Sequence, residues 1–213
     1  MRKVILFQGD SITDAARARD YEHFSGHGYA TLVKDQLGFE HPGQYTFYNR
    51  GISGNRLPDV YARMVEDIFN LKPDYMSLLI GVNDVWHGID WAKGTSEARF
   101  EKVYSLLIEE VLEELPNLKI MIMEPFVLKG IATENTEQDP KRLEKFQTGV
   151  ARMAELSRKT AEKYHLPFIS LQEKLNEMCK YAPESEWLRD GVHPTAMGHE
   201  LIKREWLKVF YSI

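Results

Sequence analysis

Near its amino terminus the chain reads Val4-Ile5-Leu6-Phe7-Gln8-Gly9-Asp10-Ser11-Ile12-Thr13-Asp14, an apolar run followed by a polar turn. Residues 4–7 have the length and composition of a buried strand. In open α/β sheets, the turn that follows such a strand lies where ligands bind. Ser11 is therefore placed for chemistry, although Gly, Asp, Ser and Thr are also the residues of an ordinary turn.

Four more apolar runs follow along the chain, and helical patterns separate them. The five predicted strands are residues 4–7, 45–49, 75–80, 119–124 and 168–171. The predicted helices are residues 27–37, a segment from Pro58 to Leu71, and residues 100–115, 143–164, 172–178 and 195–209. Alternation of this kind predicts one α/β domain over residues 1–213. We expect a three-layer, flavodoxin-like fold, with a five-stranded parallel sheet and helices on both faces.

Two polar stretches lack the periodicity of a helix or a strand. Residues 82–88 are interpreted as the loop that follows the third strand. Residues 125–140 are too long and too polar for a simple connection, so we expect a lid, a rim or a contact with another subunit.

Composition excludes several classes of function. The 213 residues carry a formal net charge of -5, and their Lys and Arg residues alternate with acids. Nucleic acid is therefore not an expected partner, and the substrate is expected to be neutral or small. No apolar run approaches the roughly 20 residues of a spanning helix, so no membrane is expected either. Cys179 is the only cysteine, which fits a cytoplasmic protein without disulfides.

The carboxyl ends of parallel strands share one edge, so residues after different strands can form one site. Ser11 there is a candidate nucleophile, His193 its general base, and Asp190 the group that orients His193. The backbone amides of Ser11 and Gly54 and the side-chain amide of Asn83 are candidate donors to an oxyanion, glycine allowing close approach. Together they predict acyl transfer.

Four blocks now carry a resemblance to a known family. They are Gly9-Asp10-Ser11-Ile12, Gly51-Ile52-Ser53-Gly54-Asn55, Gly81-Val82-Asn83-Asp84 and Asp190-Gly191-Val192-His193-Pro194. In this order they resemble the SGNH, or GDSL-type, hydrolases, with Ile12 in place of the usual Leu. The resemblance implies the same roles for Ser11, Gly54, Asn83, Asp190 and His193. The sequences of three segments are also similar to a bacterial branch of the family that includes intracellular xylan acetylesterases, namely Gly51 to Arg56, Asn83 to Trp86 and Glu137 to Pro140.

Other residues are candidates for contact with the substrate. Asp10, Asn55, Trp86 and His87 are predicted to bind it, and the rings of Trp86, His87 and Trp91 form either an acyl or sugar pocket or a cap over the core.

Two further side chains are assigned structural places. Asp84 is expected to brace its loop, and His199 to lie on a helix surface rather than bind a metal. No metal and no cofactor are predicted.

These observations favour a serine esterase that hydrolyses short acyl esters, with acetylated xylo-oligosaccharides as the preferred substrate class. A lysophospholipase, a thioesterase or a broad short-chain esterase would use the same residues with another pocket. A flavodoxin-like module that binds an anion at the Ser11 turn is the alternative from a different class, and it leaves His193 unexplained. Homo-oligomers are expected from the polar and aromatic loops.

Overall fold

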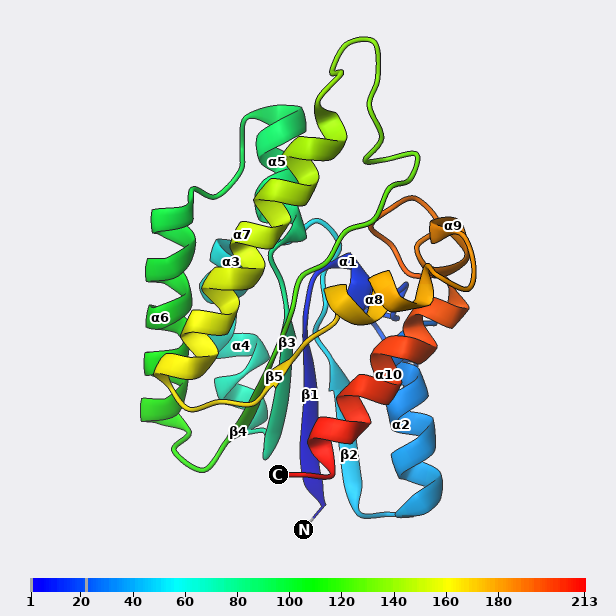
Figure 1. Cartoon of the computed structure of the whole chain (residues 1–213). Helices are drawn as coiled ribbons and strands as arrows, with labels where there is room; N and C mark the ends of the chain where they lie inside the picture. Colours follow the sequence, from blue (N-terminus) through cyan, green and yellow to red (C-terminus); the bar gives the residue numbers. More distant parts are fainter. Residues whose placement is uncertain (1, 22) are drawn as a thin grey trace.

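Residues 2–21 and 23–213 are described by the computed structural model, whose five strands form one parallel sheet (Figure 1). The strands are β1 (Lys3–Gly9), β2 (Tyr45–Asn49), β3 (Tyr75–Leu79), β4 (Lys119–Met123) and β5 (Phe168–Ile169). Their order in the sheet is β2-β1-β3-β4-β5. This is the flavodoxin-like order, with its switch point between β1 and β3. The predicted fold is confirmed.

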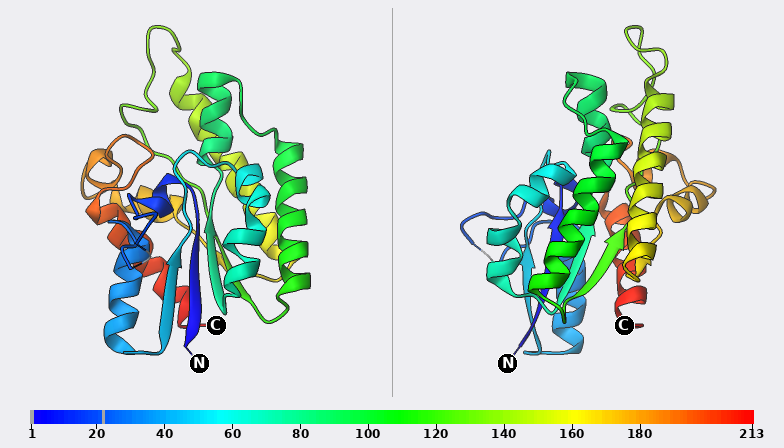
Figure 2. Two further views of the ribbon diagram at one scale, coloured as in Figure 1. Left: turned by 180° about the vertical axis from the view of Figure 1, so that it is seen from behind. Right: turned by 90° about the vertical axis from the view of Figure 1, so that its left-hand side faces the viewer.

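Helices cover both faces of the sheet, as the three views show (Figures 1 and 2). One face is covered by α2 (Tyr29–Glu40) and α10 (Ala196–Phe210), and the other by α3 (Leu57–Ala62), α4 (Met64–Asp67), α6 (Glu97–Glu114) and α7 (Arg142–Lys163). The shorter or peripheral elements are α1 (Ser11–Asp14), η1 (Phe69–Leu71), α5 (Val82–Trp91), α8 (Gln172–Met178) and α9 (Glu184–Trp187).

Alternation along the strands divides the core into two layers. In β1, Ile5 and Phe7 pack toward α2 and α10, whereas Leu6 packs toward the opposite helices. Successive side chains of a strand point to opposite faces, so a strand covered on both sides must be apolar throughout. The pairing of Gly9 with Leu79, and of Leu79 with Met123, brings the strand ends to one edge.

Residues 82–88 form the start of a helix, so the prediction of a loop there is wrong. Gly81 ends β3 with a φ of 134°, a value that favours glycine, and α5 begins at the next residue. Val85 and Ile89, four residues apart, pack against the core. This apolar spacing is what holds the segment as a helix despite its polar Asn83-Asp84 start.

The helix over residues 27–37 and the helix after Pro58 also differ from their predictions. α2 continues through Gly38 to Glu40, since a helix held by its buried face tolerates the modest cost of a glycine. The segment after Pro58 is broken into α3, α4 and η1 instead of one helix, and Arg63 stands between the first two.

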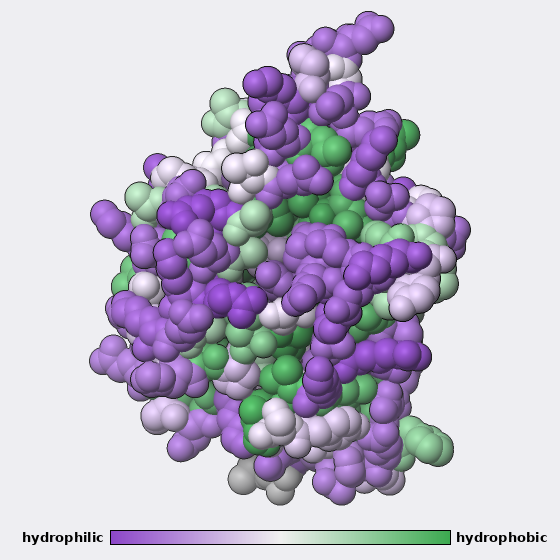
Figure 3. Space-filling model, viewed as in Figure 1, coloured by the Kyte–Doolittle hydropathy of each residue, from purple (hydrophilic) through white to green (hydrophobic). Residues whose placement is uncertain are grey.

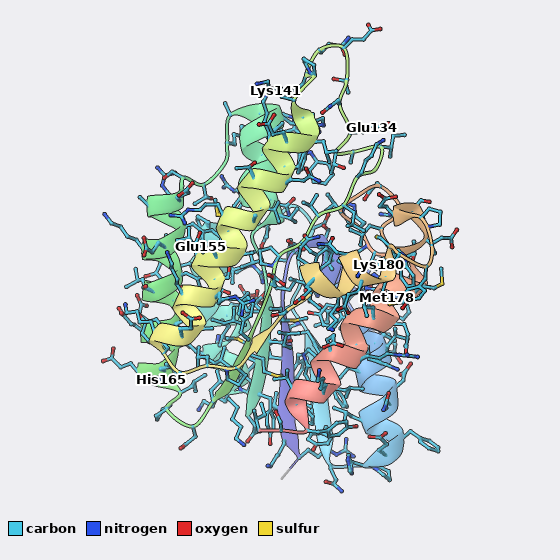
Figure 4. The ribbon with its side chains drawn as sticks, in the orientation of Figure 1. Glu134, Lys141, Glu155, His165, Met178 and Lys180 are labelled. Atoms are coloured by element: carbon cyan, nitrogen blue, oxygen red, sulfur yellow. The ribbon has the colours of Figure 1, made fainter. Side chains whose placement is uncertain are left out.

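Residues 124–141 contain neither helix nor strand, as predicted for most of this stretch. Their first part is not a lid, because Phe126, Val127 and Leu128 are buried in the core. Only the following residues project beyond the carboxyl edge of the sheet (Figures 1 and 2), where Glu134 and Lys141 are labelled in Figure 4.

The surface on the viewer's side is largely hydrophilic, with smaller apolar areas between the charged side chains (Figure 3). Within residues 2–21 and 23–213, no helix is both long and apolar enough to cross a membrane.

Candidate active site

Ser11, His193 and Asp190 form a hydrogen-bonded chain at the carboxyl edge of the sheet. Ser11 Oγ lies 2.9 Å from His193 Nε2, and His193 Nδ1 lies 2.7 Å from Asp190 Oδ2. With the proton on Nδ1, the imidazole donates to the carboxylate and accepts from the serine hydroxyl. This arrangement can remove a proton from Ser11 and so make it nucleophilic.

Gly9 and Asp10, the two residues before Ser11, fix the shape of its turn. The Asp10 Oδ1 atom accepts a hydrogen bond of 2.9 Å from the backbone N–H of Ile12 and caps α1. A Cβ atom on Gly9 would lie only 2.4 Å from the Leu79 carbonyl oxygen, so no larger residue fits against β3. These contacts place Ser11 as the first residue of α1, directly after β1.

The turn that carries His193 is organised by Asp190. Its Oδ1 atom accepts the backbone N–H groups of Val192 and His193, at 2.9 and 2.7 Å, while Gly191 takes a φ of 95°. Burial on its own would raise the pKa of Asp190. Hydrogen bonds from the His193 ring and from the two N–H groups outweigh it and lower that pKa to about 2. The carboxylate is therefore ionised and fixed beside the imidazole.

Three candidate hydrogen-bond donors for an oxyanion remain available. In the described part of the chain, the backbone N–H groups of Ser11 and Gly54 donate to no protein acceptor. Asn83 Nδ2 donates one hydrogen to the Asn55 carbonyl oxygen at 3.0 Å, which leaves its second hydrogen free. Such donors could bind a developing oxyanion.

Glycine at position 54 is required by backbone conformation. Its φ is 81°, and an added Cβ atom would meet nothing within 4 Å. This open space is compatible with the close approach of a ligand that the sequence predicts, and the positive φ is a second reason for glycine here. Residues other than glycine adopt such a positive φ only at a cost in free energy.

Asp84 braces the start of α5, which carries Asn83. Its carboxylate accepts the backbone N–H of Leu57 at 3.1 Å, so it ties α5 to the start of α3. Burial raises the pKa of Asp84 to about 7.

The prediction that Asp10 binds substrate needs correction. Its side chain is buried, with 1% exposure for the residue, and its Oδ1 atom caps α1. Burial raises the pKa of Asp10 to about 7, and a hydrogen bond from Ile12 offsets part of that effect. Asp10 holds the Ser11 turn rather than facing a ligand.

Asn55 and His87 are also engaged elsewhere. The side-chain oxygen of Asn55 accepts from Arg63 Nε at 2.8 Å. The His87 ring packs edge-on against Trp91, with centroids 4.9 Å apart, and burial lowers the pKa of His87. Neither residue lines the cavity at Ser11 described below.

Trp86, in contrast, lies beside the catalytic histidine candidate. Its ring centroid is 6.0 Å from that of His193 and 5.7 Å from that of Phe146. Trp86 therefore both borders the site and covers the core. A place in the substrate pocket and a place as a cap over the core are not exclusive alternatives for it. Trp91 is 56% exposed at the end of α5.

A cavity of about 750 Å³ opens beside Ser11 and His193. The rest of its lining comes from α1 and the segment after it, from Ser53, and from the turn before α10 and the start of that helix. It includes Arg17, Arg19 and Arg189. Sequence reasoning missed Arg17 and Arg19 because the segment after α1 has no periodicity. It missed Arg189 because an arginine next to the Asp190 motif carries no signal of its own.

His199 also lines this cavity. The prediction that it lies on a helix surface is wrong. It is 7% exposed, and its Nδ1 atom accepts the backbone N–H of Tyr29 at 3.2 Å. Burial lowers the pKa of His199 to about 4. Across the described residues, no group of three His, Cys, Asp or Glu side chains is arranged to hold a metal ion.

Known proteins share this chain's sequence and its fold. An acetylxylan esterase from Geobacillus stearothermophilus is 35% identical over 211 residues, which cover 96% of this chain and 92% of that protein. A crystal structure of a GDSL-like lipase from Parabacteroides merdae has a TM-score of 0.87 at 34% identity, covering 98% and 96% of the two chains.

A solved catalytic mutant of the Geobacillus esterase superposes with a TM-score of 0.82 at 31% identity, covering 97% of this chain and 93% of its own. The catalytic mutants solved for that esterase replace an aspartate, a serine and a histidine by alanine. Residues 7–201 of this chain match the GDSL-like Lipase/Acylhydrolase family. The chain is thus a carboxylic ester hydrolase and belongs to the GDSL-like lipase/acylhydrolase family.

Proposed function

We propose that this enzyme removes acetyl groups from carbohydrates such as xylo-oligosaccharides, through an acyl-serine intermediate. The observation that carries the proposal is the hydrogen-bonded chain from Ser11 through His193 to Asp190. The acetylxylan esterase relative supports the choice of substrate class.

In the first half of the reaction, His193 Nε2 takes the Ser11 hydroxyl proton while Oγ attacks the ester carbonyl carbon. The carbonyl oxygen becomes an oxyanion, and Ser11 N–H, Gly54 N–H and the free Asn83 amide hydrogen stabilise it. The intermediate then breaks its bond to the alcohol oxygen, which takes the proton from His193. Ser11 is left acylated and the alcohol departs.

In the second half, a water molecule replaces the alcohol. His193 takes a proton from this water, whose oxygen attacks the acyl carbon. Collapse of the second intermediate breaks the bond to Ser11 Oγ and returns the proton to it. Throughout, Asp190 holds the imidazole and stabilises its charged form.

The small-acyl preference is supported by the position of Trp86. Its large ring lies next to His193 and packs against Phe146, and we infer that it limits the size of the acyl group. We therefore expect acetyl esters to react faster than long-chain esters and thioesters. A comparison of kcat/KM across acetylated xylo-oligosaccharides, long-chain acyl esters and acyl thioesters tests this, and a preference for long chains would favour a lysophospholipase or thioesterase instead.

The mechanism is tested by Ser11→Ala, which removes the nucleophile. We expect kcat on a short acetyl ester to fall by at least about 10⁴-fold with thermal unfolding unchanged. Ser185→Ala, at an exposed serine, is the matched control and should keep full turnover. Substantial turnover by the Ser11 variant would rule out the acyl-serine route.

We also propose that the chain self-associates near the rim of the site. Ile131 on the projecting segment and Trp91 at the end of α5 are 79% and 56% exposed, large apolar groups that a partner could cover. Light scattering of the purified protein would show a mass above 24.7 kDa. A monomer at micromolar concentration would reject self-association without affecting the esterase proposal.

A further inference from the structure

The cavity beside Ser11 is positively charged, although the whole chain is acidic. Arg17, Arg19 and Arg189 contribute three positive charges to its lining. Asp14 is the only acid among the described residues that line it. Among the lining residues alone this is an excess of two positive charges, which falls to one when Asp190, the ion-pair partner of Arg189, is counted with them. The whole chain has a net charge of -5. Charges focused in a cavity attract ligands of the opposite sign.

Arg17 and Arg19 are fixed at one side of this cavity. Arg17 Nε donates to the Gly51 carbonyl oxygen at 2.8 Å, and its two terminal nitrogens have no partner in the described part of the chain. Arg19 pairs with Asp14 at 2.5 Å, so the one acidic residue of the lining is already in an ion pair. Burial and the nearby Arg19 charge lower the pKa of Arg17 to about 10, so Arg17 stays protonated at neutral pH.

Arg189 approaches from the other side, directly before the Asp190 turn. Its side chain is 69% exposed, and its Nε atom lies 3.9 Å from Asp190 Oδ2, which is an ion-pair distance but too long for a hydrogen bond. Bracing of the Gly51 turn could account for Arg17 and Arg19, and the ion pair with Asp190 could account for Arg189. A single ligand group in the cavity would account for all three at once.

We propose that this cavity binds an oxyanion group, a carboxylate or a phosphate, carried by the sugar portion of the ester substrate. Guanidinium groups present paired N–H donors that match these groups. A volume of about 750 Å³ is within the range of small-molecule sites and leaves room for a sugar next to Ser11. The inference rests on the esterase function proposed above and narrows its substrate to acetylated carbohydrates that also carry a carboxylate or phosphate group.

The charge preference is measured by inhibition of the hydrolysis of 4-nitrophenyl acetate, an uncharged ester. Glucose, glucuronic acid and glucose 6-phosphate are the three probes. We expect at least one anionic sugar to inhibit at about tenfold lower concentration than glucose, and less so as salt is added. Stronger inhibition by glucuronic acid identifies a carboxylate site, and stronger inhibition by glucose 6-phosphate a phosphate site. Equal inhibition by all three overturns the inference.

Arg189→Gln removes one cation without touching the Gly51 turn. It should raise the inhibition constant of the preferred anion about tenfold and leave that of glucose unchanged, a split that a merely structural role would not produce. Arg204→Gln is the matched control, since Arg204 is 72% exposed and lies outside this cavity. An unchanged ratio in the Arg189 variant contradicts the proposal. If the wild type does not hydrolyse the ester, the esterase function itself fails.

Discussion

Asn83 holds its side-chain amide in place through one N–H group and keeps the other free. In Asn83→Ala, the oxyanion would lose a donor that acts mainly in the transition state. We expect kcat to fall by about 10²-fold, with a smaller change in KM. Steady-state kinetics on an acetyl ester provides the measurement. The exposed Asn176, which bonds only to Gln172 through its side chain, supplies a control in Asn176→Ala. A kcat within twofold of wild type would remove Asn83 from the proposed oxyanion site.

Single residues were predictable from sequence where a short motif sets their surroundings. Asp190 and His193 are three residues apart, and their contact is made within one turn. Arg17 could not be found in this way, because only the folded chain places it in the cavity beside Ser11. The burial of Asp10 was missed for a similar reason, since a carboxylate next to a nucleophile also fits a ligand contact.

At the scale of elements, one ion pair connects α5 to the start of α7 and to the projecting segment. Arg142 donates to Asp90 at 2.5 and 3.1 Å, and its Nε atom donates to the Ala132 carbonyl oxygen at 2.8 Å. Asp90 also accepts from Trp86 Nε1 at 2.6 Å. The orientation of Trp86 beside His193 is therefore coupled to the anchoring of residues 129–141.

Asp90→Ala should release both Trp86 and the projecting segment. We expect limited proteolysis within residues 129–141 to accelerate about tenfold, as the loss of hydrogen bonds between charged groups predicts. Asp139→Ala is the comparison variant, since Asp139 lies within the segment and pairs with Lys145 of α7 instead of with α5. Equal cleavage rates in both variants would show that the Asp90 pair does not anchor the segment.

Helices and strands with strong apolar patterns were predicted well, whereas a helix that begins with polar residues was not. The strand at Tyr45–Asn49 and the helix at Gln172–Met178 match their predicted bounds. α5 was mistaken for a loop because Asn83-Asp84 is typical of turns. The burial of Asp84 against Leu57, which makes these residues part of a helix start, is a tertiary contact.

At the scale of the whole molecule, alternating strands and helices were enough to predict the parallel sheet and its shared edge. The contact between α2 and α10 could not be predicted from this alternation. His199 of α10 accepts the first backbone N–H of α2 from a residue 170 positions away. A histidine in a helix carries no sequence signal for so distant a partner.

This contact makes folding stability sensitive to acid. The pKa of buried His199 is about 4, below the 6.5 of an exposed histidine, so the unfolded chain takes up the proton first. The His199 contribution is complete above pH 6.5 and is lost as the pH falls toward 4. Asp10 and Asp84, whose pKa values are raised to about 7, act in the opposite direction, so a variant must be compared with wild type at each pH.

His199→Asn keeps a hydrogen-bond acceptor for Tyr29 and removes the titrating ring. Between pH 7.5 and 4.5, we expect the variant to lose about 2–3 kcal/mol less unfolding free energy than wild type does. Urea unfolding at both pH values measures this double difference, in which the common effects of Asp10 and Asp84 cancel. His23→Asn, at an exposed histidine, should behave as wild type. If the His199 variant loses as much stability as wild type, the buried ring does not control the acid sensitivity of the fold.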